Sequence, residues 1–289
     1  MKTTPLHQDF GILIDAVDLR QVTADDGYPA IRSLFETHSL LLFRNQQIDD
    51  TTHRRLCRLF GPLEDRSQGH RNPDASDIGG VTNVKRDGSL ADANDLRMLN
   101  LRANMLWHTD STFLPVPALI NMIVARVVSE SGGATEFASS RAAFESFEPA
   151  LQQQLEQTVF RHRYSHSRRR ISAVLAEEPL FTMWPDQYWR GVWQNPVNGR
   201  KALYIASHAC GIEGISDETA QPFIDDLIER ATAPERVYAH EWQVGDVIVW
   251  DERAVLHRGT PWPLDQERSL SSYCVTASEQ DGLASVRPG

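Results

Sequence analysis

Short apolar segments of strand length recur along this chain from about residue 80, and they restrict its fold more than any other feature. Turn residues separate these segments, which is the pattern of an antiparallel β-sandwich or jelly roll. The segments are residues 119–128, 135–137, 202–205, 246–250 and 270–276. The sequence therefore predicts a mainly β fold with flanking helices, built on a double-stranded β-helix core of the jelly-roll, cupin-like kind.

Helical spacing of apolar residues predicts the flanking helices. They are expected at residues 28–38, 49–60, 140–156 and 216–231. Asp50 or Thr51 can act as N-cap of the second helix, and Ser216 begins the last one with a good N-terminal signal. Strands are also expected at residues 11–19 and 39–43. Because no repeat and no Pro/Gly/Ser-rich linker divides the chain, residues 1–289 are expected to form a single domain.

Composition excludes several classes of partner. The 39 acidic residues outnumber the 29 Lys and Arg, and the formal net charge of −10 argues against nucleic acid, whose binding depends on neutralising phosphates. It also argues weakly against an anionic membrane surface. The three cysteines are widely spaced with no CxxC pair, which favours free thiols in a reducing compartment. No signal peptide and no run of about 18 apolar residues is visible. A cytoplasmic protein that binds neither nucleic acid nor membrane is expected.

Four residues suggest a metal centre with an anion-binding site beside it. His108 and Asp110 are two positions apart, so on a strand they point to the same face. His257 can complete a set of two imidazoles and one carboxylate, which suits Fe(II) and leaves coordination sites open. Arg268 follows eleven residues later. Its guanidinium can form a bidentate pair with the far carboxylate of a dicarboxylate whose other end chelates the metal.

The chain resembles the taurine/2,4-D dioxygenase (TauD/TfdA) family, and most closely its aryloxyalkanoate dioxygenase branch. The matching segments run nearly from end to end, and they include residues 60–64, 106–111, 132–137 and 250–259. The resemblance implies iron at His108, Asp110 and His257, and 2-oxoglutarate at Arg268 and Thr135. It also implies the double-stranded β-helix fold. The implied activity uses Fe(II), 2-oxoglutarate and O2 to oxidise a C–H bond of a small organic metabolite, with release of succinate and CO2. Hydroxylation, desaturation and cyclisation are all compatible with it.

One departure from that branch concerns the substrate. The branch is expected to hold the substrate carboxylate with an arginine a few residues beyond the cosubstrate arginine, and here Ser271 or Ser272 stands at that place. A serine hydroxyl is a neutral and weaker partner for a carboxylate. We therefore expect a substrate that is neutral, or an acid held by other cations, with Lys85 and Arg86 the nearest candidates beside Ser272.

Several alternatives stay open at this point. One is ether cleavage of aryloxyalkanoates such as 2,4-D, and another is a metal-binding β-helix protein that is not an oxygenase, such as an isomerase or a ligand-binding module. A homo-oligomer is expected from the resemblance. The basic segment 161–170 is expected to be a solvated loop or a lid whose cations meet an anionic substrate. The aromatic cluster Phe181, Trp184, Tyr188, Trp189 and Trp193 is expected to line a pocket, to join the core or to form a subunit contact.

Overall fold

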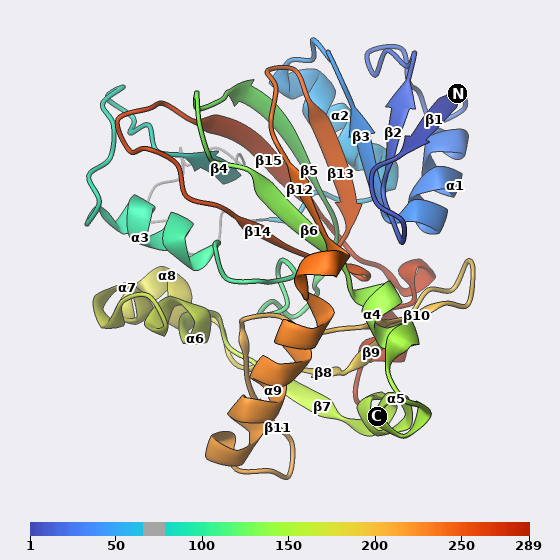
Figure 1. The fold of residues 1–289 in the computed structure, drawn as a ribbon, viewed down its shortest axis with the longest axis vertical. Coiled ribbons are helices and arrows are strands. Elements are labelled where there is room, and N and C mark those ends of the chain that lie inside the picture. Colours follow the sequence, from blue (N-terminus) through green and yellow to red (C-terminus); the bar gives the residue numbers. More distant parts are fainter. Residues whose placement is uncertain (66–78) are drawn as a thin grey trace.

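The computed structural model describes residues 1–65 and 79–289 (Figure 1). Its strands are β1 Lys2–Pro5, β2 Ile12–Asp15, β3 Leu40–Phe43, β4 Gly79–Thr82, β5 Ala118–Val127, β6 Thr135–Ser139, β7 Val159–His162, β8 Gln187–Arg190, β9 Val192–Gln194, β10 Lys201–Leu203, β11 Ala209–Ile212, β12 Val237–His240, β13 Val247–Asp251, β14 Val255–Gly259 and β15 Ser269–Thr276. Its α-helices are α1 Tyr28–His38, α2 Asp50–Phe60, α3 Leu96–Ala103, α4 Ser140–Ser146, α5 Pro149–Gln157, α6 Tyr164–Arg169, α7 Ala173–Glu177, α8 Pro179–Thr182, α9 Asp217–Ala231 and α10 Leu283–Val286. Short 3₁₀ turns lie at Pro234–Arg236 and Glu279–Asp281. The predicted mainly β chain with flanking helices is confirmed.

The largest sheet has seven strands in the order β1-β2-β3-β13-β5-β15-β4. Its central strands β3, β5 and β13 are buried along most or all of their length, as expected for a sheet that is covered on both faces. Neighbouring side chains on a strand point to opposite faces. Leu41 and Val249 accordingly pack on one side of the sheet, whereas Leu40 and Ile248 pack on the other.

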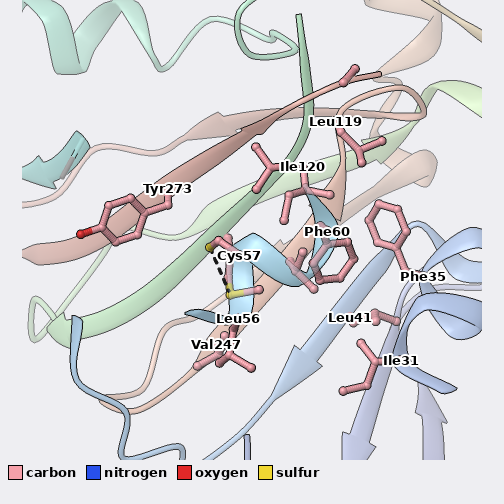
Figure 2. Packing of buried hydrophobic residues seen from close by; sticks show 14 of the residues in the cluster. Ile31, Phe35, Leu41, Leu56, Cys57, Phe60, Leu119, Ile120, Val247 and Tyr273 are labelled. Atoms are coloured by element: carbon pink, nitrogen blue, oxygen red, sulfur yellow. Dashed lines mark hydrogen bonds between the residues drawn. The ribbon is translucent and has the colours of Figure 1, made fainter. Parts of the chain in front are cut away.

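Helices α1 and α2 cover one face of this sheet. Figure 2 shows apolar side chains of the two helices packed against side chains of the strands beneath them. The rings of Phe35 in α1 and Phe60 in α2 meet edge to face at 5.2 Å between centroids. Asp49 caps α2 by accepting a hydrogen bond from the backbone N–H of Thr52 at 2.7 Å. The expected N-cap at Asp50 or Thr51 was therefore wrong by one or two positions, because the N-cap side chain must reach the N–H three residues ahead.

The opposite face of the large sheet meets a three-stranded sheet of order β12-β6-β14. Side chains from both sheets form one core between them, including Leu42, Trp250 and Leu270 from the large sheet and Phe137 and Val255 from the small one. Two sheets packed face to face in this way, both antiparallel except for the parallel pair β2–β3, form the double-stranded β-helix core, which confirms that prediction. Residues of both sheets line the cavity that holds the candidate site.

A helical layer packs below the sheets (Figure 1), where α4, α5 and α9 share a core with β7, β10 and β11. The helix predicted at 216–231 is confirmed as α9 with Ser216 as its N-cap. The single helix predicted at 140–156 is wrong, because the structure has α4 and α5 with a break before Pro149. Glu148 has the extended conformation that a following proline imposes on its predecessor. None of the helices in residues 1–65 and 79–289 has the length and apolar character that a membrane crossing requires.

Candidate metal centre

Three residues from two distant parts of the chain meet beside β14, the edge strand of the small sheet. His108 pairs with His257 of β14 through two backbone hydrogen bonds, and Asp110 lies two residues further along the chain, in a turn. One ligand atom from each of these three side chains lies within 4.8 Å of the other two. His108 Nε2 is 3.6 Å from Asp110 Oδ1, and His257 Nε2 is 3.9 Å from Asp110 Oδ2. The structure thus brings together the three residues that the sequence singles out as ligands.

The surroundings of the two imidazoles favour their neutral form, which is the form that binds a metal. His108 Nδ1 lies 2.7 Å from the carbonyl oxygen of Leu106, so Nδ1 carries the proton and Nε2 keeps its lone pair toward Asp110. Burial is the largest cause that lowers the pKa of His108, and it lowers the pKa of His257 to about 3. Nδ1 of His257 is buried without a hydrogen-bond partner, 4.0 Å from the Glu252 carboxyl. Two neutral imidazoles and a carboxylate form a donor set that fits Fe(II) or Mn(II).

Asp110 is held by groups that sequence reasoning missed. Its backbone N–H donates to Glu252 Oε2 at 2.8 Å, and its Oδ2 accepts a hydrogen bond from Asn121 Nδ2 at 2.7 Å. Asn121 is itself fixed, because Ser272 Oγ donates to its Oδ1 at 2.7 Å. The one signal for Asn121 in the sequence is its polar side chain among the apolar residues of 118–125 in β5.

Removing this support should weaken metal binding while the three ligands remain. We expect Asn121→Ala to reduce Mn(II) affinity by about 10- to 100-fold, the usual effect of losing a hydrogen bond to a ligand. Ser272→Ala should have a smaller effect in the same direction, and Ser272→Thr should restore the affinity. Titration of each variant with Mn(II), monitored by electron paramagnetic resonance, measures the Mn(II) affinity. Unchanged affinity in Asn121→Ala would contradict the positioning role.

Arg268 and Thr135 line the same cavity as the three candidate ligands. The Arg268 side chain is almost fully buried, and its Nε and Nη2 both donate to the carbonyl oxygen of Gly133, at 3.1 and 2.8 Å. Among the residues that the structure describes, Nη1 has no acceptor. Thr135 Oγ1 accepts from Trp242 Nε1 at 3.0 Å, which leaves the hydroxyl proton for another acceptor. Both side chains can therefore donate to one anion.

Burial lowers the pKa of Arg268 to about 10. The guanidinium remains protonated at neutral pH, but its charge is costly to keep in this environment. The indole ring of Trp262 covers it, with 4.8 Å between the guanidinium carbon and the ring centroid. A carboxylate placed at Nη1 would offset the cost of this buried charge.

The cavity has a volume of about 750 Å³, which is within the range of pockets for small organic ligands. Lys85, Arg86 and Ser272 are all in its lining. Arg86 is exposed and Lys85 is half-buried in the turn that follows β4. The hydroxyls of Ser271 and Ser272 have different hydrogen-bond partners. That of Ser271 accepts from Arg126 Nε, whereas that of Ser272 donates to Asn121 Oδ1.

The basic segment 161–170 is part of β7 and α6 rather than a loop, so that part of the expectation was wrong. The aromatic cluster divides between two places. Phe181 and Trp184 line the cavity, while Trp189 and Trp193 belong to the core beside the large sheet. Tyr188 is exposed.

The family model described as "Taurine catabolism dioxygenase TauD, TfdA family" matches residues 2–273. The chain is 33% identical to the alpha-ketoglutarate-dependent 2,4-dichlorophenoxyacetate dioxygenase of Cupriavidus pinatubonensis, over 92% of this chain and 94% of that protein. It is 32% identical to the (S)-phenoxypropionate/alpha-ketoglutarate-dioxygenase of Sphingobium herbicidovorans, over 92% and 91%. A crystal structure of AAD-2 in complex with Mn(II) and N-oxalylglycine superposes with a TM-score of 0.89 and 31% identity, over 97% of this chain and 99% of that one.

Proposed function

The chain belongs to the taurine catabolism dioxygenase TauD, TfdA family, and from this premise we propose how its site works. It is a 2-oxoglutarate-dependent dioxygenase that uses Fe(II) and O2 to oxidise a C–H bond of a small organic molecule, with release of succinate and CO2. In our proposal His108, Asp110 and His257 hold the iron, and Arg268 and Thr135 hold the far carboxylate of 2-oxoglutarate. The observation that carries this assignment is the convergence of these five side chains on one cavity.

The residues of the site have different roles in the proposed reaction. Bound iron with 2-oxoglutarate and O2 supplies the oxidising power. The Leu106 carbonyl and Asn121 keep the ligand atoms of His108 and Asp110 aimed at the metal. Arg268 and Thr135 orient the cosubstrate, and apolar side chains of the lining such as Phe113 and Trp184 limit the access of water to the reacting atoms. The cavity wall around Lys85, Arg86 and Ser272 receives the substrate, in keeping with the family's use of small molecules.

A second candidate within this class is ether cleavage of an aryloxyalkanoate, which the two relatives named above favour. If the oxidised carbon carries an ether oxygen, the hemiacetal product collapses and the ether bond breaks. Ser272 argues against the herbicide type of substrate, since it stands where that branch is expected to hold an arginine. A metal-binding protein without oxygenase activity is not favoured, because the relatives named above are dioxygenases. We further propose a single domain, a cytoplasmic location and a homo-oligomeric state.

The decisive experiment measures succinate formed from 2-oxoglutarate with Fe(II), ascorbate and air. We expect slow succinate formation without substrate and a marked increase with one member of a panel that contains an aryloxyacetate together with neutral and acidic metabolites. His108→Ala should abolish both, because it removes a metal ligand. An absence of succinate under every condition would contradict the proposed function. Strongest stimulation by the aryloxyacetate would favour ether cleavage instead of oxidation of another metabolite.

A further inference from the structure

We propose that Glu252 is a positioning residue that holds two of the three metal-ligand residues at once, by accepting hydrogen bonds from the backbone N–H of Asp110 and from Nδ1 of His257. This inference rests on the proposed function and deepens it. It assigns a hydrogen-bond acceptor to the His257 ring, and it connects the two distant segments of the chain that carry the ligands.

Glu252 occupies a fixed and fully buried place directly after β13. Its side chain has no exposed surface, and its backbone N–H donates to the carbonyl oxygen of Leu119 at 2.9 Å. Its Oε2 accepts from the backbone N–H of Asp110 at 2.8 Å. In the part of the chain that the structure describes, its Oε1 has no hydrogen-bond partner. Because buried carboxyl groups are costly unless they are hydrogen-bonded, this unused capacity indicates a further donor.

The two acidic residues at the end of β13 have different surroundings. Asp251 pairs with Arg253 at 2.8 Å, and Arg253 also pairs with Glu36 at 2.7 Å. These side chains form a buried ion network that ties β13 to α1. Glu252, in contrast, has no arginine or lysine partner among residues 1–65 and 79–289, and the neighbouring ionisable groups that contact it are the metal-ligand residues. Its surroundings therefore relate it to the metal centre.

The donor that matches Glu252 is Nδ1 of His257. For Nε2 of His257 to bind a metal, Nδ1 must carry the proton, and metal-bound histidines usually donate this N–H to an acceptor. Nδ1 of His257 is buried and has no such acceptor within hydrogen-bond distance in the described part of the chain. Glu252 Oε2 lies 4.0 Å from it, about 1 Å beyond a usual N–H···O distance. A small rotation of either side chain closes this gap.

The His257 ring is oriented by its neighbours. Its centroid lies 4.2 Å from that of His108 and 4.7 Å from that of Trp250, so the packed rings restrict its rotation. The Nδ1 of His108, in contrast, is 2.7 Å from the carbonyl oxygen of Leu106, two residues away in the chain. One imidazole thus has a local backbone acceptor, and the other depends on a side chain from β13.

The role requires an acceptor oxygen and does not require a charge. Burial is the largest cause that raises the pKa of Glu252. A carboxyl group keeps an oxygen with two lone pairs whether or not it is ionised. One such oxygen can accept from both Asp110 and His257. An amide oxygen of the same length can do the same, whereas a thioether sulfur is only a weak acceptor.

The test compares Glu252→Gln with Glu252→Met, which have similar size but differ in the acceptor. Titration with Mn(II), monitored by electron paramagnetic resonance, measures metal affinity. We expect Glu252→Met to lower the affinity about 10- to 100-fold, the usual effect of losing a hydrogen bond that orients a ligand. Glu252→Gln should remain within about threefold of the wild type, because its oxygen still accepts. Wild-type affinity in Glu252→Met overturns the proposal, and so does an equal loss in both variants.

Proton NMR of the Co(II)-substituted protein gives a signature of the contact itself. The Nδ1–H protons of two metal-bound imidazoles should give two strongly shifted signals that disappear in D2O. In both variants we expect the signal of His257 to move, because its acceptor has changed, while that of His108 stays in place beside the Leu106 carbonyl. Two unmoved signals overturn the proposal. If Glu252→Met does not fold, the comparison of wild type with Glu252→Gln still decides.

Glu136→Met is the matched control, because Glu136 is a carboxyl of the small sheet that pairs with Arg258, the residue after His257. Successive side chains of a strand point to opposite faces, so this pair lies away from the His257 ring. The control should keep Mn(II) affinity within about twofold of the wild type. If the wild type binds Mn(II) and forms succinate, and Glu252→Met does so equally well, only the role of Glu252 is wrong. If the wild type binds no Mn(II), the proposed function itself fails.

Discussion

Asp110→Asn will abolish tight binding of Fe(II) or Mn(II) and, with it, succinate formation. The substitution preserves the size of the side chain but replaces the only carboxylate among the three convergent ligand residues with a neutral amide. His108 and His257 are neutral, so they cannot offset the charge of a divalent ion at this partly buried place. We expect Mn(II) affinity to fall by about a thousandfold, comparable with the loss of one partner from a buried charge pair.

The measurement is a titration of the protein with Mn(II), monitored by electron paramagnetic resonance and by calorimetry. Asp18→Asn is the control, because Asp18 pairs with Arg20 at the exposed surface, far along the chain from the site. It should bind Mn(II) as the wild type does. Unaltered metal affinity in Asp110→Asn would remove Asp110 from the ligand set, and the assignment of the centre would have to be revised.

Arg268→Gln will raise the KM for 2-oxoglutarate by about two to three orders of magnitude, because a buried, hydrogen-bonded charge is lost from the cosubstrate site. The side chain is fixed by Gly133 and Trp262, and Nη1 has no acceptor among the residues that the structure describes. Its charge is present at neutral pH although burial lowers its pKa to about 10. Arg268→Lys should be impaired less, since it keeps a cation but cannot form the bidentate pair.

Steady-state succinate formation at varied 2-oxoglutarate concentration, together with calorimetric binding to the Mn(II) protein, checks this expectation. Arg126→Gln provides the control, because Arg126 pairs with Asp50 in a partly exposed position and should leave the KM unchanged. Mn(II) affinity should also stay unchanged in Arg268→Gln, which distinguishes loss of the cosubstrate contact from collapse of the metal centre. A normal KM in Arg268→Gln would exclude this arginine as the anchor of 2-oxoglutarate.

Much of this protein was predictable from local patterns in its sequence. Apolar runs and helical spacing are local properties, so they predicted α1 with its bounds and located β3, β13 and β15 within one residue at either end. The sequence also singled out His108 and Asp110, which the structure brings together although His108 forms only an isolated bridge and Asp110 lies in a turn rather than on a strand. The resemblance to the TauD/TfdA family suggested Thr135 beside Arg268, and both line the same cavity. The single helix predicted at 140–156 was wrong, and the cause was also local, because Pro149 divides it into two helices.

Contacts between distant segments could not be predicted in this way. Asn121, Glu252 and Ser272 come from separate parts of the chain, and only the folded sheets place them around Asp110. The roles of the arginines in the basic segment 161–170 could not be predicted from the sequence either, because nothing local distinguishes one of them from another. Their roles depend on which way each side chain points and on what the neighbouring elements present to it. Local sequence determined the elements and the ligand types, and tertiary packing decided that Arg168 faces the cavity while Arg161, Arg163 and Arg170 pair with surface carboxylates.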